Sequence, residues 1–266
     1  MSSKLLVVGA CLLFFAACSS SAPAEEKADE KPDVKEAEPA KLDPYEILAK
    51  HYEAMGGLEK LKAVQTEYSE GIVTTFGSEG EEQKGSFKQW RRFPLMYRQE
   101  LNLGDMEQIS GDDGRKSWVV AMGGMPQVFG DEAAVKARKV RGLLAQYDHL
   151  DRDSESFAVK YAGTEKVDGA KCHVVEISNR MNDDVSRQYF DEESYLLIRE
   201  VITRPSGEER ITYSNYRETD GLMHAFTRVK ESGSGTSERG FGLETTTLEV
   251  NPTIDPKRFR IPTPEV

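Results

Sequence analysis

Residues 186–230 of this 266-residue chain read SRQYFDEESYLLIREVITRPSGEERITYSNYRETDGLMHAFTRVK, and this stretch decides the fold class. Short segments of alternating apolar and polar residues are separated by turn residues, including Pro205-Ser206-Gly207 and Thr219-Asp220-Gly221. A period of two is typical of β-strands, and closely spaced turn signals join such strands into hairpins. The stretch therefore predicts consecutive antiparallel strands with one face exposed to water.

The same pattern extends from this stretch toward both ends of the chain. In the second half we expect strands over residues 157–166, 171–178, 186–191, 196–203, 208–218, 222–230 and 239–250. In the first half we expect strands over residues 72–76, 85–92, 96–103, 107–110 and 116–122, with turns at 77–80 and 111–114. The body of the chain is therefore predicted to be mainly antiparallel β.

Helices are predicted before and between these two groups of strands. Asp43-Pro44 is typical of an N-cap followed by proline at the first helical position, and the helix pattern continues to Gly56-Gly57. A short second helix is expected over residues 58–63. Residues 131–150 begin with acidic residues and carry an apolar stripe of Val140, Leu143, Leu144 and Tyr147. We interpret this segment as a helix that covers the core and exposes a basic side of Lys136, Arg138, Lys139 and Arg141. A last helical turn is expected over residues 255–259.

The N-terminus has the features of an exported chain. Lys4 precedes an apolar run over residues 5–15, which is too short to span a bilayer and is typical of a signal peptide. The end of this run, Phe15-Ala16-Ala17-Cys18, resembles the lipobox of bacterial lipoproteins. That resemblance implies cleavage after residue 17 and acylation of Cys18, for example with palmitate. The alternative is an ordinary signal peptide with a chance cysteine.

Residues 18–43 follow as a segment of Ser, Ala, Pro, Glu and Lys with almost no apolar residues. Such a segment cannot bury enough surface to offset its ordering entropy, so we expect a disordered tether. Residues 44–266 are then left as one folded domain. Ser19 after the acylated cysteine implies, by resemblance to enterobacterial lipoprotein sorting, the outer membrane and a domain that faces the periplasm.

Composition and missing motifs exclude several classes of function. A net charge of −11 argues against nucleic acid as a partner. Because Cys11 leaves with the signal and Cys18 carries the lipid, Cys172 is alone and is interpreted as a buried structural residue. The four histidines share no metal-ligand spacing, and neither a nucleophile elbow nor a phosphate loop is present. The carboxylate pairs at 112–113 and 183–184 fall in predicted turns. We therefore predict a protein that is not an enzyme and has no metal or cofactor.

Several segments together resemble a known family. They are YEAMGGLEKL at 52–61, YFD at 189–191, LLIRE at 196–200, YSNYRETDGL at 213–222, LEVN at 248–251 and IDPKRF at 254–259. Over residues 44–262 they are similar to the outer-membrane lipoprotein-sorting (LolA/LolB-like) superfamily of periplasmic proteins. The resemblance implies an unclosed, curved antiparallel β-barrel, or half-barrel, whose concave face is covered by helices.

The resemblance also implies a lipid or a lipoprotein acyl chain as ligand. Burial stabilises an acyl chain by about 0.8 kcal/mol per methylene, so a cavity between sheet and helices would hold one. The candidate lining residues are Trp90, Trp118, Val120, Leu143, Leu144 and Tyr147, although each of them would also fit an ordinary core. Two functions stay open. The first is a membrane-anchored protein that binds lipids or lipoprotein acyl chains, as an acceptor in their transfer. The second is a non-enzymatic interaction or stress-sensing module with envelope proteins as partners.

Overall fold

The computed structural model describes residues 42–76, 81–205, 207–232 and 239–263, without the side chain of Arg239. Cys18, nearly all of the predicted tether and the turn at 77–80 lie outside these residues. The helices are α1 Pro44–Ala54, α2 Leu58–Ala63 and α3 Glu132–Ala145, with 3-10 turns η1 Asp148–Leu150 and η2 Pro256–Phe259. The strands are β1 Thr66–Phe76, β2 Glu82–Arg92, β3 Met96–Leu103, β4 Met106–Asp112, β5 Ser117–Ala121, β6 Gln127–Phe129, β7 Phe157–Val167, β8 Ala170–Asn179, β9 Val185–Asp191, β10 Leu197–Arg204, β11 Gly207–Thr219, β12 Leu222–Ser232 and β13 Arg239–Val250.

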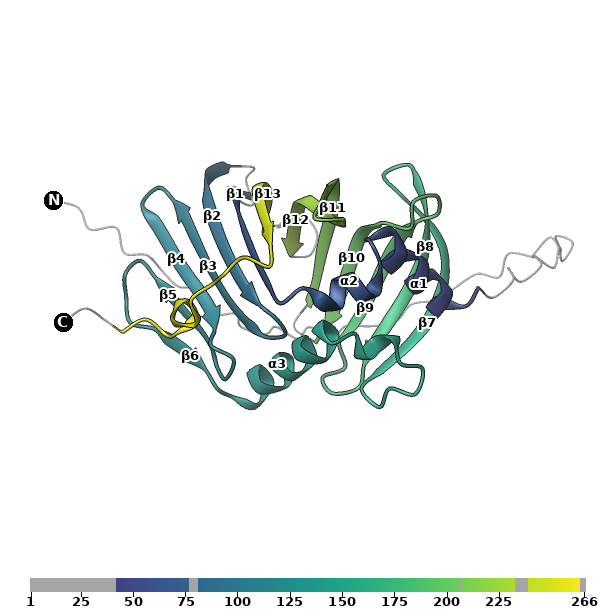
Figure 1. Cartoon of the computed structure of the whole chain (residues 1–266), viewed down its shortest axis with the longest axis horizontal. Helices are drawn as coiled ribbons and strands as arrows, with labels where there is room; N and C mark the ends of the chain where they lie inside the picture. Colours follow the sequence, from purple (N-terminus) through teal and green to yellow (C-terminus); the bar gives the residue numbers. More distant parts are fainter. Residues whose placement is uncertain (1–41, 77–80, 206, 233–238, 264–266) are drawn as a thin grey trace, which may run out of the picture. The chain divides into compact units, whose positions relative to one another are not determined.

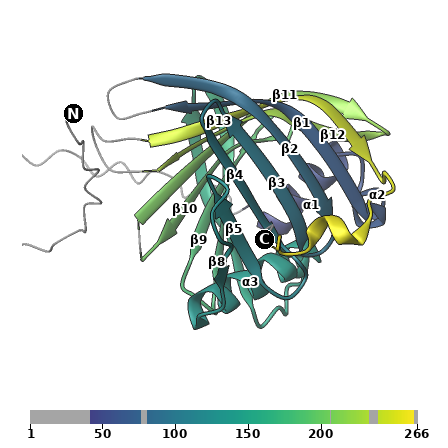
Figure 2. The ribbon, with the colours of Figure 1, turned by 90° about the vertical axis from the view of Figure 1, so that its left-hand side faces the viewer.

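All of these strands belong to one antiparallel sheet in the order β6-β5-β4-β3-β2-β1-β13-β12-β11-β10-β9-β8-β7. Every neighbouring pair is also consecutive in the chain except β1 and β13, which meet in the middle of the sheet. The two edge strands are therefore β6 and β7, and the chain runs from one edge to the other through α3 and η1 (Figure 1). The sheet is curved and does not close (Figure 2), which confirms the predicted half-barrel.

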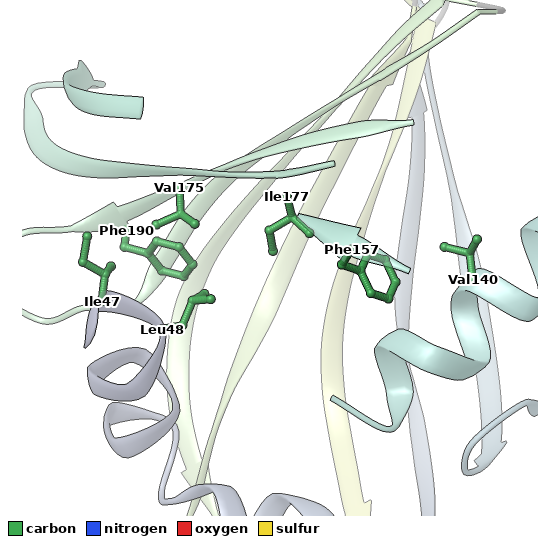
Figure 3. Packing of buried hydrophobic residues seen from close by; sticks show 7 residues of the cluster. All are labelled: Ile47, Leu48, Val140, Phe157, Val175, Ile177 and Phe190. Carbon is green, nitrogen blue, oxygen red and sulfur yellow. The ribbon is translucent and has the colours of Figure 1, made fainter. Parts of the chain in front are cut away.

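One face of the sheet contacts the helices, and we call it the helix side. Its core contains Ile47 and Leu48 of α1, Val140 of α3, Phe157 of β7, Val175 and Ile177 of β8, and Phe190 of β9 (Figure 3). Leu48 is 1% exposed and Phe190 is completely buried. Burying such side chains contributes about 1.5–3 kcal/mol each, so these contacts hold α1 and α3 on the sheet.

The helices begin where the sequence predicts. Asp43 accepts a hydrogen bond from Tyr45 N at 3.0 Å before Pro44, and Asp131 accepts one from Ala134 N at 2.9 Å. Helix α2 has the predicted bounds. Helix α3 ends at Ala145, five residues before the predicted end at 150, because Tyr147 takes the left-handed conformation (φ 61°). The chain then continues as η1.

The predicted turn at 111–114 is wrong, because Gly111 and Asp112 are the last two residues of β4. Glycine is required at 111, since a Cβ there would lie 2.5 Å from the Trp118 ring. Asp112 is completely buried. The hairpin turn is formed by residues 113–116 instead. Strand β6 is an additional short edge strand that the sequence pattern does not reveal.

The C-terminal segment 251–263 lies on the face opposite the helix side. There Arg98 donates to Arg258 O at 3.4 Å, and the Arg258 guanidinium lies 4.6 Å from the Trp90 ring. The predicted last helical turn is confirmed as η2, with Asp255 as its N-cap and Phe259 completely buried. Cys172 is also completely buried, as predicted.

Candidate functional site

Two adjoining cavities lie on the helix side, next to the C-terminal end of α3. Their volumes are about 600 Å³ and about 430 Å³. They share Phe93 and Pro94, from the turn between β2 and β3, and Ala145 of α3. Both volumes fall within the range of about 300–1,000 Å³ that is typical of ligand pockets. We treat the two cavities together as the candidate site.

The first cavity lies among α2, the start of β1, the start of β12 and the residues that follow α3. Besides the shared residues, its lining consists of Leu61, Lys62, Val64, Gln65, Glu67, Gln146, Tyr147, Leu222 and His224. The second cavity lies between the β2–β3 hairpin and α3. Its further lining consists of Gln89, Arg91, Arg92, Leu95, Met96, Tyr97, Arg141 and Leu144. Apolar side chains are therefore combined with several cationic ones.

Two of the candidate residues chosen from the sequence line these cavities. Tyr147 lines the first cavity and Leu144 the second, where Leu144 is 38% exposed. Burial raises the pKa of the Tyr147 hydroxyl, so this side chain is neutral at pH 7. Leu143 packs instead against the helix-side core.

The other three candidates, Trp90, Trp118 and Val120, lie on the opposite face. A helix-side row pairs Glu67, Arg91, Tyr97, Asp112 and Ser117 directly across β1 to β5. The neighbouring row, one residue along each strand, contains Trp90 and Trp118. Successive side chains of a strand point to opposite faces, so both Trp side chains point away from the helices, as does Val120 two residues after Trp118. These three residues line neither cavity. The two-residue spacing of Trp118 and Val120 predicts that they share a face of the sheet, but it does not predict whether that face is the helix side.

Sequence reasoning missed most of the lining, including Phe93, Pro94, Leu222 and His224. The available signal was the Phe-Pro pair, which places a large apolar side chain in a turn between two strands. Leu222 and His224 follow the Asp-Gly turn at the start of a strand. Nothing in their local pattern distinguishes them from ordinary inward-facing residues.

Arginine side chains of α3 fix this helix to the sheet. Arg138 Nε lies 2.9 Å from Asp112 Oδ2, Arg141 Nη2 lies 3.3 Å from the same oxygen, and Arg141 also donates to Ser117 Oγ at 3.0 Å. Arg138 further donates to Gly114 O. Two residues of the predicted solvated basic side therefore contact a buried carboxylate. The prediction that the 112–113 carboxylates simply occupy a turn is therefore also wrong for Asp112, which ends β4 and binds both arginines.

The C-terminal end of α1 carries a cluster of aromatic and imidazole side chains. His51 Nδ1 donates to Tyr195 O at 2.9 Å, and Tyr52 Oη shares a hydrogen bond of 2.9 Å with His149 Nε2 in η1. Burial lowers the pKa of His51 to about 4, and it lowers that of His149 to about 4 although the nearby Asp148 carboxylate acts in the opposite direction. Both rings are therefore neutral at pH 7 and connect α1 to the turn between β9 and β10 and to η1.

Among the described residues, no group of three or more His, Cys, Asp or Glu side chains is arranged to hold a metal ion. None of the helices described here combines the length and the apolar character that crossing a bilayer requires.

Comparison with known proteins identifies the fold. No family model matches the chain, and no curated protein matches its sequence. A DUF1329 family protein from Desulfovibrio piger has a TM-score of 0.55 and 14% identity, covering 82% of this chain and 98% of its own. An outer-membrane lipoprotein-sorting protein domain from Vibrio parahaemolyticus has a TM-score of 0.53 and 11% identity, covering 81% and 95%. A LolA superfamily protein from Nitrosomonas europaea has a TM-score of 0.51 and 11% identity, covering 76% and 95%. The chain therefore has the fold of the LolA-like, outer-membrane lipoprotein-sorting proteins.

Proposed function

We propose that this chain is a membrane-anchored, non-enzymatic protein of the cell envelope that binds lipids or lipoprotein acyl chains, as an acceptor in their transfer. One observation carries the proposal, namely the pair of adjoining cavities under the end of α3. Proteins of this fold include one described as an outer-membrane lipoprotein-sorting domain. A cavity with both apolar and cationic lining suits a molecule that has an acyl chain and a polar head.

The proposed anchor is the lipid on Cys18, with residues 1–17 removed and residues 18–43 as the tether. A flexible chain of n residues spans about 5–6 Å × √n, so the tether would let the domain reach tens of ångströms from the bilayer. An anchored domain suits a stationary acceptor better than a diffusing carrier. The outer membrane, with the domain in the periplasm, is the location that Ser19 supports.

The ligand is tested by mass spectrometry of lipid that co-purifies with the chain. Ala145 lines both cavities, so Ala145→Trp should fill the space and remove most of the bound lipid. The matched control is Ala133→Trp, because Ala133 is an exposed residue of the same helix. Equal lipid in both variants, at equal thermal stability, would exclude the cavities as the binding site.

The anchor is tested separately by fractionation. The wild-type chain should sediment with membranes, and Cys18→Ser should appear in the soluble fraction. Density-gradient separation of inner and outer membranes tests the location. A Cys18→Ser variant that stays in the membrane fraction would refute lipid anchoring at this cysteine.

A second candidate function, an envelope interaction module, is favoured by exposed apolar residues near β6. Met122 is 75% exposed, Met125 79% and Val135 58%. Methionine-rich surfaces adapt to varied partners, and exposed apolar residues mark interaction sites where they are grouped. Crosslinking in cells distinguishes the two functions. A captured envelope protein that is lost in Met122→Ser but kept in Ala145→Trp supports the interaction module.

A further inference from the structure

The charges around the candidate site differ from those of the chain as a whole. The chain has a net charge of −11, yet three cationic side chains and one carboxylate line the two cavities on the helix side. The cations are Lys62, Arg91 and Arg141, and the carboxylate is Glu67. Arg92 also borders the second cavity, but its guanidinium donates to Ile254 O on the opposite face. Solubility does not account for a local excess of positive charge inside a concave face.

A fourth cation, Arg228 of β12, lies on the same face, where it interacts electrostatically with Arg91 and Glu67. It pairs directly with Tyr213 of β11 and Leu243 of β13, and Leu243 pairs with the buried Val73 on the helix side. Directly paired residues share a face, so Arg228 is also on the helix side. Burial and the neighbouring Arg91 lower the pKa of Arg228, while Glu67 acts in the opposite direction.

Glu67 is the carboxylate that acts on both arginines. It is 7% exposed and lies 4.0 Å from Arg91, whereas among the described residues no carboxylate forms an ion pair with Arg228. One carboxylate cannot neutralise two guanidinium groups. Buried charges are normally paired, because removing an unpaired charge from water is costly. The arrangement therefore leaves about one positive charge uncompensated next to the cavities.

His224 has a ring nitrogen without a hydrogen-bond partner, among the residues described, beside the same cavities. Its side chain lines the first cavity, and its Nε2 is buried without a hydrogen-bond partner in the described part of the chain. Buried polar atoms are nearly always hydrogen-bonded, so a partnerless one needs an explanation. An acidic oxygen placed beside Arg91 and Arg228 would be close to this ring.

We propose that the ligand of the two cavities is an anionic amphiphile, with its acidic headgroup on Arg91 and Arg228 and its acyl chain along the apolar lining. The inference rests on the proposed function and specifies its ligand class. Arginine binds both carboxylate and phosphate oxygens in pairs, so a fatty acid and an anionic phospholipid share the required chemistry. Leu61, Val64 and Leu222 provide apolar surface for the chain in the first cavity.

Calorimetric titration of the delipidated full chain tests this inference with matched ligands. Oleate is compared with methyl oleate, and lysophosphatidylglycerol with lysophosphatidylcholine, so that each pair shares its acyl chain and differs in net charge. At least one acidic ligand should bind about 10-fold more tightly than its partner, since a fixed cation favours an anion by such factors. Preference in the first pair assigns a carboxylate, and preference in the second assigns a phospholipid headgroup with a net negative charge.

The variants locate the effect. Arg228→Gln and Arg91→Gln should each bring the ratio close to 1, because each weakens the binding of the acidic ligand more than that of its neutral partner. Arg228→Lys, which retains the charge, should keep the preference, as should Arg115→Gln, because Arg115 is exposed and lines neither cavity. Thermal melts confirm that each variant is folded.

The outcomes separate this inference from the proposed function. If methyl oleate binds as tightly as oleate, and the two phospholipids bind equally, the headgroup inference is overturned and acyl binding stands. If the preference survives in both Gln variants, the assignment to Arg91 and Arg228 is overturned. If none of the four ligands binds, the proposed function fails as well.

Discussion

Replacing Asp112 with alanine should destabilise the chain more than any other single change to the contact between α3 and the sheet. The carboxylate is completely buried and accepts from Gly114 N at 2.8 Å and Ser117 Oγ at 2.9 Å in addition to its two arginines. The Arg138 side chain is only 19% exposed, so Asp112→Ala leaves a partly buried guanidinium without its charge partner. Removing one member of a buried ion pair costs about 3–5 kcal/mol, compared with about 5–15 kcal/mol of total stability for a typical domain.

The assay is denaturant unfolding of the purified chain, with hydrogen exchange of residues 132–145 as a local measurement. Asp112→Asn keeps an acceptor for Gly114 N and loses the charge, so its cost should be lower, about 1–3 kcal/mol. The control is Lys136→Ala, which removes an exposed cation that is paired with Glu132 at 2.9 Å on the same helix. That change should cost at most about 0.5 kcal/mol. If Asp112→Ala costs no more than the control, or if exchange in α3 is unchanged, the ion pairs do not fix α3 to the sheet.

Other predictions concern stability and accessibility. Between pH 6.5 and 4 the unfolded chain binds more protons than the folded one, because the pKa values of His51 and His149 are lowered from 6.5 to about 4 on folding. Stability should therefore fall as pH decreases through that window, by up to about 3 kcal/mol per histidine, and denaturant titrations that show no loss there would contradict the assignment. Leu48→Ala should cost about 2–5 kcal/mol, and Leu144→Ala at an exposed position less than about 1 kcal/mol, in the same assay. Equal costs would argue against the packing of α1 on the sheet. The thiol of Cys172 has a pKa that is raised by burial, so peptide mapping should find it unlabelled by a thiol reagent until the chain unfolds, and rapid labelling of the folded chain would contradict its burial.

The fold could be predicted from the sequence because its signals are local. Most strands alternate over a short stretch, and most turns between them contain Gly, Asp or Pro. Asp43 and Asp131 each cap a helix by accepting from a backbone N–H within three residues. The family resemblance added the curvature and the open edges, which no local pattern contains. Strand β6 was missed because its three residues are all exposed and show no alternation.

The candidate site could be predicted only in part, because a cavity is a property of several distant segments. Alternation assigns residues to two faces and does not say which face receives the helices. Trp118 illustrates this limit, since a large buried aromatic residue is equally consistent with either face and lies on the one without helices. Asp112 illustrates a second limit. Gly-Asp is a strong turn signal, and the arginines that bind the carboxylate are 26 and 29 residues away in the chain.

Arg141 connects the stability of α3 with the proposed ligand and gives a prediction that separates the two. It lines the second cavity and also contacts Asp112, so part of its charge is neutralised by that carboxylate. In Asp112→Ala the guanidinium loses this partner and adds positive charge to the cavity. The same change should therefore lower the free energy of unfolding. It should also raise the ratio of oleate to methyl oleate affinity, which is measured by calorimetry at pH 7 without denaturant. A variant in which both quantities fall would show that binding depends on the position of α3 rather than on the charge of the lining. Arg115→Gln, which changes an exposed arginine in the turn beside Asp112, should change neither quantity appreciably.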